Sequence, residues 1–308
     1  MVPVLQEALG LTLFQLASAA PVEYLNEARV VTWWKPQPPL KWQIILNADS
    51  GYGNLNLPDV QVYDVDLEGT SSATIASLHA NGKKVICYFS AGTYEKWRTG
   101  KNKFNAADLG NKIAQGDTAA DGHWPGERWI NIKSTSLLNN VMIPRIKSAK
   151  DKGCDGIDPD NMDGYGVDAG PKPGGFFPKT GFALTKQDTI DYITKLAIEA
   201  HNRGLAIGLK NSGEVAPQVE PLVDYAVNKE CASYNECSTW LPLTNHQKQV
   251  FHIEYPEGDY SLAQIPTAEF NRDCAKGGPA QSNFSTIVKN WDVISEARWC
   301  TGPTISTP

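Results

Sequence analysis

The sequence predicts an α/β fold, a single (β/α)8 barrel of the TIM type. Apolar runs of strand length alternate with helical patterns along most of the 308 residues, which is typical of a parallel sheet whose faces are covered by helices. The alternation repeats nearly eight times over roughly 250 residues, and this favours a closed barrel over an open sheet. No Gly-x-Gly-x-x-Gly sequence follows the first strand, which weakens the alternative of a dinucleotide-binding fold.

The predicted strands are short runs rich in β-branched, aromatic and other apolar residues. In chain order they cover Trp42–Leu46, Val60–Asp66, Lys84–Ser90, Trp129–Ile132, Gly156–Asp160, Leu205–Lys210, Tyr225–Glu230, Val250–Tyr255 and Ser285–Asn290. The short run at Trp129 is the least regular of these.

The helical patterns fall between these strands. They cover Ala73–Ala80, Leu137–Asp151, Thr185–Arg203 and Glu214–Leu222. Pro144 is expected to kink the second helix. The third begins at a capping-box pattern, Thr185 with Asp188, and is stopped by Gly204. The Gly- and Pro-rich segment Gly164–Gly181 is predicted to be a long loop that forms a wall of the active site.

The composition is that of a globular protein, with 41% hydrophobic and 20% charged residues. The net charge is −6, and no run of Lys and Arg forms a basic stripe, so nucleic acid is not an expected partner. No stretch is long and apolar enough to span a bilayer. We expect a monomer without a cofactor.

The N-terminus and the cysteines indicate secretion. Residues 1–20 are predicted to be a signal peptide or a disordered tail, because an apolar segment precedes the cleavage pattern Ala17-Ser18-Ala19, although the usual positive region is missing. Residues 21–308 then form the barrel. The six cysteines leave the connectivity open: Cys231 and Cys237 could close one loop, Cys274 and Cys300 could tie down the C-terminal segment, and Cys87 and Cys154 form a third pair or remain as two buried thiols.

Polar side chains end most of the predicted strands, and the ends of parallel barrel strands meet at one face. These side chains are Asp64 and Asp66, then Asp158, Asp160 and Asn161, then Lys210, then Asn228 and Glu230, then Glu254 and Tyr255. Converging carboxyl groups suit glycoside hydrolysis, in which one donates a proton while the other attacks or activates water. A single Asp at a strand end is more often a cap than a catalyst, but acids at four of these strand ends favour function. Glu127 and Arg145 are expected to form an ion pair under the same face.

A metal site is a competing interpretation of the same carboxylates. Asp158, Asp160 and Asp163 resemble the start of a calcium-binding EF-hand loop. The rest of that pattern does not match, since the Gly at its sixth position and the later Glu are both missing. The sequence therefore predicts no metal ligands.

Eight ordered blocks make the sequence recognisable. After Trp42-Gln43 they are YDVD (63–66), ICYFSAG (86–92), YEKWR (94–98), GERW (126–129), GCDGIDPDN (153–161), AHNRGLAIGLKN (200–211), DYAVNKEC (224–231) and FHIEY (251–255). This series resembles glycoside hydrolase family 114, the endo-α-1,4-polygalactosaminidases, from about Trp34 to Tyr255. The resemblance implies a (β/α)8 barrel and cleavage of α-1,4-linked galactosamine polymers, which are cationic when deacetylated.

The resemblance also implies a catalytic pair. Asp160 matches the catalytic Asp of the DPDN block, and Glu230 is the best remaining acid at the end of the predicted strand Tyr225–Glu230. Family members often read Asn-Glu-x-Cys there, whereas this chain reads Asn228-Lys229-Glu230-Cys231, so the family Glu aligns with Lys229. The expected substrate-binding residues are Asp64, Asp66, Tyr88, Asp158, Asn161, Tyr165, Lys210, Asn228, Glu254 and Tyr255.

The sequence thus predicts a secreted, endo-acting glycoside hydrolase for galactosamine-containing polysaccharide. A carbohydrate-binding barrel with little or no hydrolysis is the first alternative, motivated by Lys229. A structural or adhesive surface protein and a metal-dependent enzyme are the other two.

Overall fold

In the computed structural model, eight parallel strands form the barrel. The structure describes residues 31–47, 55, 57–113, 124–170, 178–258, 261–275, 283–300 and 304–305. The chain separates into Met1–Val30 and Val31–Pro308, and the predicted signal peptide or tail lies outside the described residues. The barrel strands are β1 (Trp42–Ile45), β2 (Val62–Asp66), β3 (Lys84–Ser90), β7 (Gly156–Asp160), β8 (Ala206–Lys210), β9 (Tyr225–Lys229), β10 (Gln249–Glu254) and β11 (Phe284–Val288).

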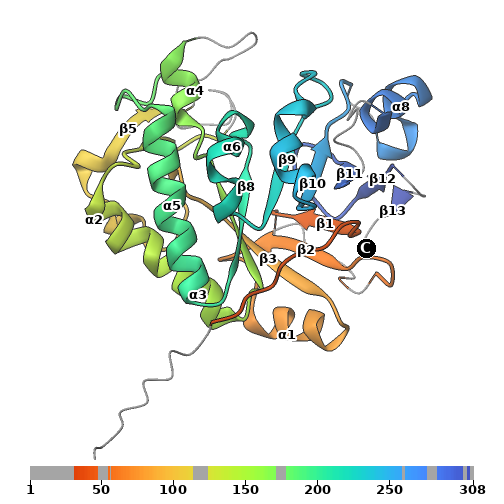
Figure 1. Ribbon diagram of the computed structural model, residues 1–308, viewed down its shortest axis with the longest axis horizontal. Coiled ribbons are helices and arrows are strands. Elements are labelled where there is room, and N and C mark those ends of the chain that lie inside the picture. Colours follow the sequence, from red (N-terminus) through yellow and green to blue (C-terminus); the bar gives the residue numbers. More distant parts are fainter. Residues whose placement is uncertain are drawn as a thin grey trace, which may run out of the picture. The chain divides into compact units, whose positions relative to one another are not determined.

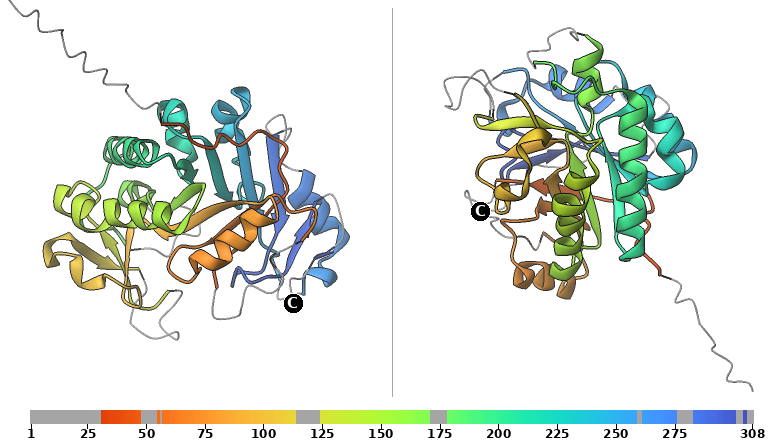
Figure 2. Two further views of the ribbon diagram at one scale, coloured as in Figure 1. Left: turned by 90° about the horizontal axis from the view of Figure 1, so that it is seen from below. Right: turned by 90° about the vertical axis from the view of Figure 1, so that its left-hand side faces the viewer.

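Each barrel strand pairs in parallel with the next one in this order. Helices lie outside the sheet, as Figures 1 and 2 show, with α1 beside β3 and α5 beside β8. The helices are α1 (Ser72–Ala80), α2 (Thr135–Leu137), α3 (Ile143–Lys152), α4 (Gly164–Ala169), α5 (Lys186–Asn202), α6 (Ala216–Val219), α7 (Leu241–Asn245) and α8 (Thr267–Ala275). The fold is therefore the predicted TIM-like barrel. Among the described residues, no helix is long and apolar enough to cross a membrane.

Three local predictions differ from the structure. The predicted strand at Trp129 belongs to a separate antiparallel sheet of β4 (Thr93–Glu95), β6 (Glu127–Ile130) and β5 (Leu109–Lys112). The helix predicted from Leu137 is interrupted by a π-helical turn at Leu138–Met142, and Pro144 follows that turn directly, in the first turn of α3. The predicted loop after Gly164 starts as helix α4, while residues 171–177 lie outside the described residues.

Aromatic rings fill the barrel interior toward the amino-terminal ends of the strands. Tyr225 packs edge-on against Phe251, with ring centroids 5.7 Å apart, and Phe251 contacts Trp42. A Cβ atom on Gly208 would lie 2.5 Å from the Tyr225 ring, so the glycine makes room for it. The Tyr225 hydroxyl donates to the carbonyl of Ile157 at 2.7 Å. This packed layer supports the polar residues at the carboxyl ends of the strands.

The barrel closes between β1 and β11 without a backbone ladder. The Trp42 indole donates to the carbonyl of Ser285 at 2.8 Å, Lys289 donates to the Gln43 side chain at 2.8 Å, and the Trp299 indole donates to the carbonyl of Trp42 at 2.9 Å. The strands β12 (Ala297–Trp299) and β13 (Thr304–Ile305) extend the sheet beyond β11 in antiparallel order. We call this closure the seam.

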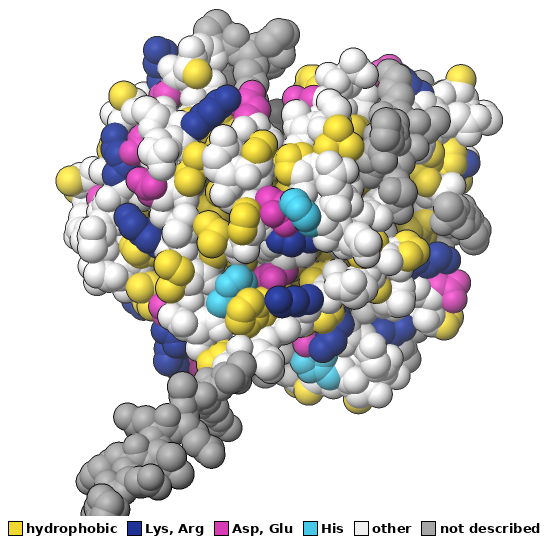
Figure 3. Space-filling view, viewed as in Figure 1, with side chains coloured by type: hydrophobic (Ala, Val, Ile, Leu, Met, Phe, Trp, Pro, Cys, Tyr) yellow, Lys and Arg dark blue, Asp and Glu magenta, His cyan; other side chains and the backbone are white. Residues whose placement is uncertain are grey.

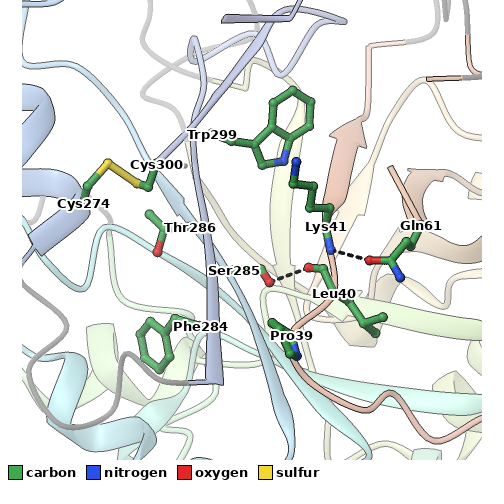
Figure 4. A pocket seen from close by; sticks show the side chains of 10 residues that line it. All are labelled: Pro39, Leu40, Lys41, Gln61, Cys274, Phe284, Ser285, Thr286, Trp299 and Cys300. Carbon is green, nitrogen blue, oxygen red and sulfur yellow. Dashed lines mark hydrogen bonds between the residues drawn. A yellow bond between two sulfur atoms is a disulfide. The ribbon is translucent and has the colours of Figure 1, made fainter. Parts of the chain in front are cut away.

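A cavity of about 560 Å³ opens at the amino-terminal end of the seam. Figure 4 shows the residues that line it: Pro39, Leu40, Lys41, Gln61, Cys274, Phe284, Ser285, Thr286, Trp299 and Cys300. Most of the lining residues precede or begin β1, β2 and β11, so this cavity lies at the barrel end opposite the predicted site.

All six cysteines form disulfides. The pairs are Cys87–Cys154, Cys231–Cys237 and Cys274–Cys300. The two pairs suggested by proximity are thus formed, and of the two possibilities for Cys87 and Cys154 the structure has the disulfide.

Candidate active site

The polar strand ends of β2, β3 and β7 lie side by side at one end of the barrel. In the sheet register, Asp66 is opposite Tyr88, Tyr88 is opposite Asp158, and Ser90 is opposite Asp160. The convergence follows from parallel pairing, because each strand points its carboxyl end to the same face.

A buried acid pair and a lysine lie innermost. The Lys210 ammonium is 2.5 Å from Oδ2 of Asp158, and the two side chains are 2% and 0% exposed. Burial, together with the negative charge of Asp158, raises the pKa of Asp64 well above its usual range. This shift favours the protonated form of Asp64, which can donate a hydrogen bond to Asp158. Burial also raises the pKa of Asp158, although Lys210 opposes the shift.

Asp160 is held by its backbone at the outer edge of this group. Its Oδ1 accepts the Asn161 N–H at 2.8 Å, and its carbonyl accepts the N–H groups of Ala91 and Gly92. A Cβ on Gly92 would lie 1.6 Å from the carbonyl oxygen of Asn161, so only glycine allows this approach. The Asn161 amide donates to Ser90 Oγ at 3.0 Å, which directs it toward β3. Asp160 itself is 6% exposed.

Lys229 faces Asp160. Along β9, Lys229 lies on the same side as Tyr225, whose ring is inside the barrel. Burial has the largest effect and lowers the pKa of the Lys229 ammonium, but the interactions with Asp160, Tyr255 and Asp163 together outweigh it, so this pKa is raised. Asn228 points the other way and accepts from the Trp240 indole at 3.2 Å once its amide is oriented to satisfy both groups. A substrate contact by Asn228 is therefore not supported.

Glu230 lies just beyond the strand end, in the left-handed backbone region with a φ of 61°. Burial raises the pKa of its carboxyl, and Lys229 opposes this shift. The charges of Glu230 and Asp160 both raise the pKa of the Tyr255 hydroxyl, although burial has the larger effect. Glu230 and Asp160 are thus both within electrostatic range of Tyr255.

Glu254 is used to hold the loop after β9. Its Oε1 accepts from the Ala232 N–H at 2.8 Å, its Oε2 accepts from Ser233 Oγ at 2.8 Å, and His252 lies 2.7 Å from Oε1. The side chain is completely buried. These contacts favour a structural role over the predicted substrate contact.

A second acidic group lies beside Tyr88. Arg98 joins two of its carboxylates, with Nη1 2.5 Å from Asp66 Oδ2 and Nε 3.0 Å from Glu95 Oε2. The Gly69 N–H donates to the other oxygen of Asp66 at 2.7 Å. Asp66 is therefore already paired, so its geometry gives no support to a direct contact with substrate.

Glu127 belongs to this group and was expected to pair with Arg145. It lies opposite Glu95 across the β4–β6 ladder, and like charges in that position repel each other. Burial, the charge of Glu95 and, more weakly, the charge of Asp160 raise the pKa of Glu127 to about 8. Arg145 instead donates to the Ser90 carbonyl, so the expected ion pair is wrong. Glu127 is a neutral acid at pH 7.

The aromatic candidates lie in two different settings. The Tyr88 ring is 5.3 Å from the Lys210 ammonium, and burial with the charge of Asp160 raises the pKa of its hydroxyl well above normal. Tyr255 stacks on Trp291 with ring centroids 4.4 Å apart and planes 11° apart. Both tyrosines therefore border the charged group around Asp160.

Tyr165 lies on α4, in the segment predicted to form a wall. It is 4% exposed, and Lys186 lies 6.0 Å from its ring centroid. Burial and the charges of Glu214 and Asp163 raise the pKa of its hydroxyl. Asp163 also acts on Lys229, so Tyr165 lies on the Lys229 side of the site, while Asp160 is not among the charges acting on it.

The structure thus brings together part of the predicted set. The central group is Asp64, Tyr88, Asp158, Asp160, Lys210 and Tyr255, with Lys229 and Glu230 at its edge. Sequence reasoning missed the place of Glu127 and the stacking of Trp291, and it gave Lys229 no contact. The alternation of side chains along β9 could have placed Lys229 inside the barrel.

Metal binding receives no support from the described residues. Only one group of three potential ligands lies close enough together, Cys231, Cys237 and His252. Its two cysteines form a disulfide, so they offer no thiolate. The three carboxylates suggested for Ca²⁺ or Mg²⁺ do not converge in this way. On the face shown in Figure 3, acidic and basic side chains are interspersed.

Comparisons with known proteins agree with this geometry. The profile of glycoside-hydrolase family GH114 matches residues 25–304. The crystal structure of Aspergillus fumigatus Ega3 in complex with galactosamine is 40% identical, with a TM-score of 0.75, and the match covers 87% of this chain and 98% of that one. The glycoside hydrolase domain of PelA from Pseudomonas aeruginosa shares the fold at 10% identity, with a TM-score of 0.57 over 88% of this chain and 99% of that one. No curated protein matches significantly.

The profile match spans most of the barrel, and the identity to the Ega3 structure extends over nearly all of that protein. The eight sequence blocks, the barrel and both comparisons agree, and the chain belongs to glycoside-hydrolase family GH114.

Proposed function

We propose that this protein is a secreted, endo-acting hydrolase of α-1,4-linked galactosamine-containing polysaccharide. The observation that carries the proposal is the cluster of carboxyl groups around Asp160 in a chain 40% identical to a protein crystallised with galactosamine. Amino groups of a deacetylated galactosamine polymer are cationic at neutral pH. The carboxylates of the Asp160 group attract these amino groups electrostatically, and the ammonium groups of Lys210 and Lys229 offset part of the attraction.

Asp160 and Glu230 are the proposed catalytic pair. The raised pKa of Glu230 suits a proton donor to the leaving oxygen. Asp160 would act from the other side as nucleophile or base, and the Lys229 ammonium lies within electrostatic range of it. The two roles are those that glycoside hydrolysis requires of its two carboxyl groups.

The innermost residues are proposed to hold the sugar. Asp158 keeps one charge balanced by Lys210, while protonated Asp64 can donate a hydrogen bond to it. The half-buried Tyr88 offers its ring and hydroxyl beside Asp160. This arrangement combines hydrogen-bond donors and acceptors, as recognition of sugar hydroxyl and amino groups needs.

Secretion is supported by the pairing of all six cysteines. Disulfides form and persist in oxidising compartments and are rare in the cytosol.

The test is to incubate the protein with partly deacetylated α-1,4-galactosamine oligomers and to identify the products by mass spectrometry. Shortened oligomers are expected from the wild type. Asp160→Asn is expected to abolish them, whereas Asp151→Asn, on exposed α3, serves as the matched control and should retain activity. Undiminished cleavage by Asp160→Asn would overturn the assignment of Asp160.

A second candidate function is sugar binding with little or no hydrolysis. The observation that favours it is Lys229, which faces Asp160 where the alternation of β9 directs a side chain into the site. Oligomers that bind but stay intact would support this candidate. Lys229→Glu would then be expected to gain cleavage, while Glu230→Gln would leave binding unchanged. Loss of cleavage in Glu230→Gln would instead support the catalytic pair.

A further inference from the structure

Four exposed aromatic side chains among the described residues lie on segments that follow barrel strands. Trp97, Trp124, Tyr234 and Trp291 are each at least 40% exposed. Trp97 and Trp124 lie in the excursion after β3, Tyr234 follows β9, and Trp291 follows β11. Each segment leaves the carboxyl end of a barrel strand, which is the end that carries the Asp160 group. The exposed aliphatic residues Val31 and Ile198 lie elsewhere.

Trp291 is the aromatic residue with the best defined backing. It lies three residues beyond the end of β11 and is 52% exposed. Tyr255 stacks on it with a centroid distance of 4.4 Å, which leaves no space between the rings. Tyr255 is only 5% exposed. The accessible part of the indole therefore includes the face turned away from Tyr255.

Tyr255 also connects this ring to the charged group. The charges of Lys229, Lys210, Glu230 and Asp160 all act on the Tyr255 hydroxyl. The indole of Trp291 is thus one ring thickness from a side chain that borders the proposed reaction centre. A polymer bound across that centre would extend over its neighbours.

We propose that Trp291, supported from behind by Tyr255, is a stacking subsite for an amino-sugar residue of the polymer chain outside the cleavage site. A sugar ring has an apolar C–H face that packs on a flat indole, and Trp and Tyr are suited to such contacts because one part is apolar and the other polar. The ammonium group of galactosamine adds an attraction to the indole face, since Trp is the best cation–π partner. This inference rests on the proposed function and gives it a second contact point for long chains.

If Trp291 is a stacking subsite, the effect of replacing it on binding should depend on the length of the oligomer. Trp291→Ala is expected to weaken binding of a long galactosamine oligomer by about tenfold, equivalent to about 1.4 kcal/mol, while cleavage of the shortest substrate that the wild type cleaves stays unchanged. Trp291→Tyr keeps an aromatic face and should retain most of the affinity. Trp291→Leu keeps an apolar side chain without that face and should behave like Trp291→Ala.

The experiment measures binding by calorimetry and cleavage by product analysis for a short and a long oligomer. Ile198→Ala, which removes an exposed apolar side chain from outer helix α5, is the matched control. Equal loss on both oligomers, or equal affinity of Trp291→Ala and wild type for the long one, would overturn the subsite. If the wild type binds neither oligomer, the proposed function fails and the subsite fails with it. Wild-type cleavage with an unaffected Trp291→Ala variant would overturn the subsite alone.

Discussion

Glu127 gives the sharpest test of the electrostatics at this site. Burial and the like charge of Glu95 raise the pKa of the Glu127 carboxyl from 4.5 to about 8. A folded-state pKa above the unfolded one means that the native state binds the proton more tightly, so stability is lost as pH rises from the unfolded to the folded pKa. The full loss corresponds to about 5 kcal/mol from this difference in pKa, and about 3 kcal/mol of it has accumulated by pH 7.

Glu127→Gln mimics the protonated acid and removes this dependence. The variant is expected to be more stable than the wild type by about 3 to 5 kcal/mol at about pH 9, and the two are expected to differ little at about pH 4.5. Urea unfolding at a series of pH values measures the difference directly. Glu257→Gln is the control, because its side chain is 68% exposed. A difference between wild type and Glu127→Gln that stays constant across this pH range would refute the reasoning.

Three further predictions concern the barrel and its charges. Lys210→Met leaves Asp158 without its cation and is expected to lower the free energy of unfolding by about 3 kcal/mol at neutral pH. The loss should be smaller in acid, because Asp158 then takes up a proton. Equal unfolding midpoints of variant and wild type at neutral pH would contradict this. Gly208→Ala places a Cβ 2.5 Å from the Tyr225 ring and should cost about 1 to 3 kcal/mol in a thermal melt, whereas an unchanged Tm would show that the core adapts freely. Treatment with EDTA should leave hydrolysis intact, since no usable set of metal ligands converges among the described residues; activity lost on EDTA and regained with Ca²⁺ or Mg²⁺ would reverse that view.

Most of the barrel could be predicted because its strands are buried on both faces. Lys84–Ser90 and Gly156–Asp160 have the predicted bounds, since each is a continuous apolar run between clear breaks. The short strands β4 and β5 carry no such signal, because their burial depends on a hairpin that packs beside the barrel. The pattern at Trp129 was therefore read as a barrel strand.

The residues that gather at the site were easier to predict from the sequence than the directions in which their side chains point. Strand ends located Asp158, Asp160 and Lys210, and the parallel register joins them. The roles of Glu254 and Asn228 could not be inferred, because their partners come from loops that sequence patterns do not place. The alternation of side chains along β9 places Lys229 on the same side of the strand as Tyr225. Glu230 is the next residue, lies beyond the end of the strand and has a left-handed backbone conformation.

The seam has a consequence for how the protein is made. Its bonds join Trp42 to Ser285 across 243 positions and Trp42 to Trp299 across 257. During synthesis, the first strand leaves the ribosome long before its two partners exist. Most of the sheet can pair strand by strand in the order of translation, but the edge of β1 stays open until β11 and Trp299 have emerged. For this period the nascent barrel presents a hydrogen-bonding edge that another chain could occupy, and Ser285 and Trp299, which cover it, are translated 243 and 257 positions after Trp42.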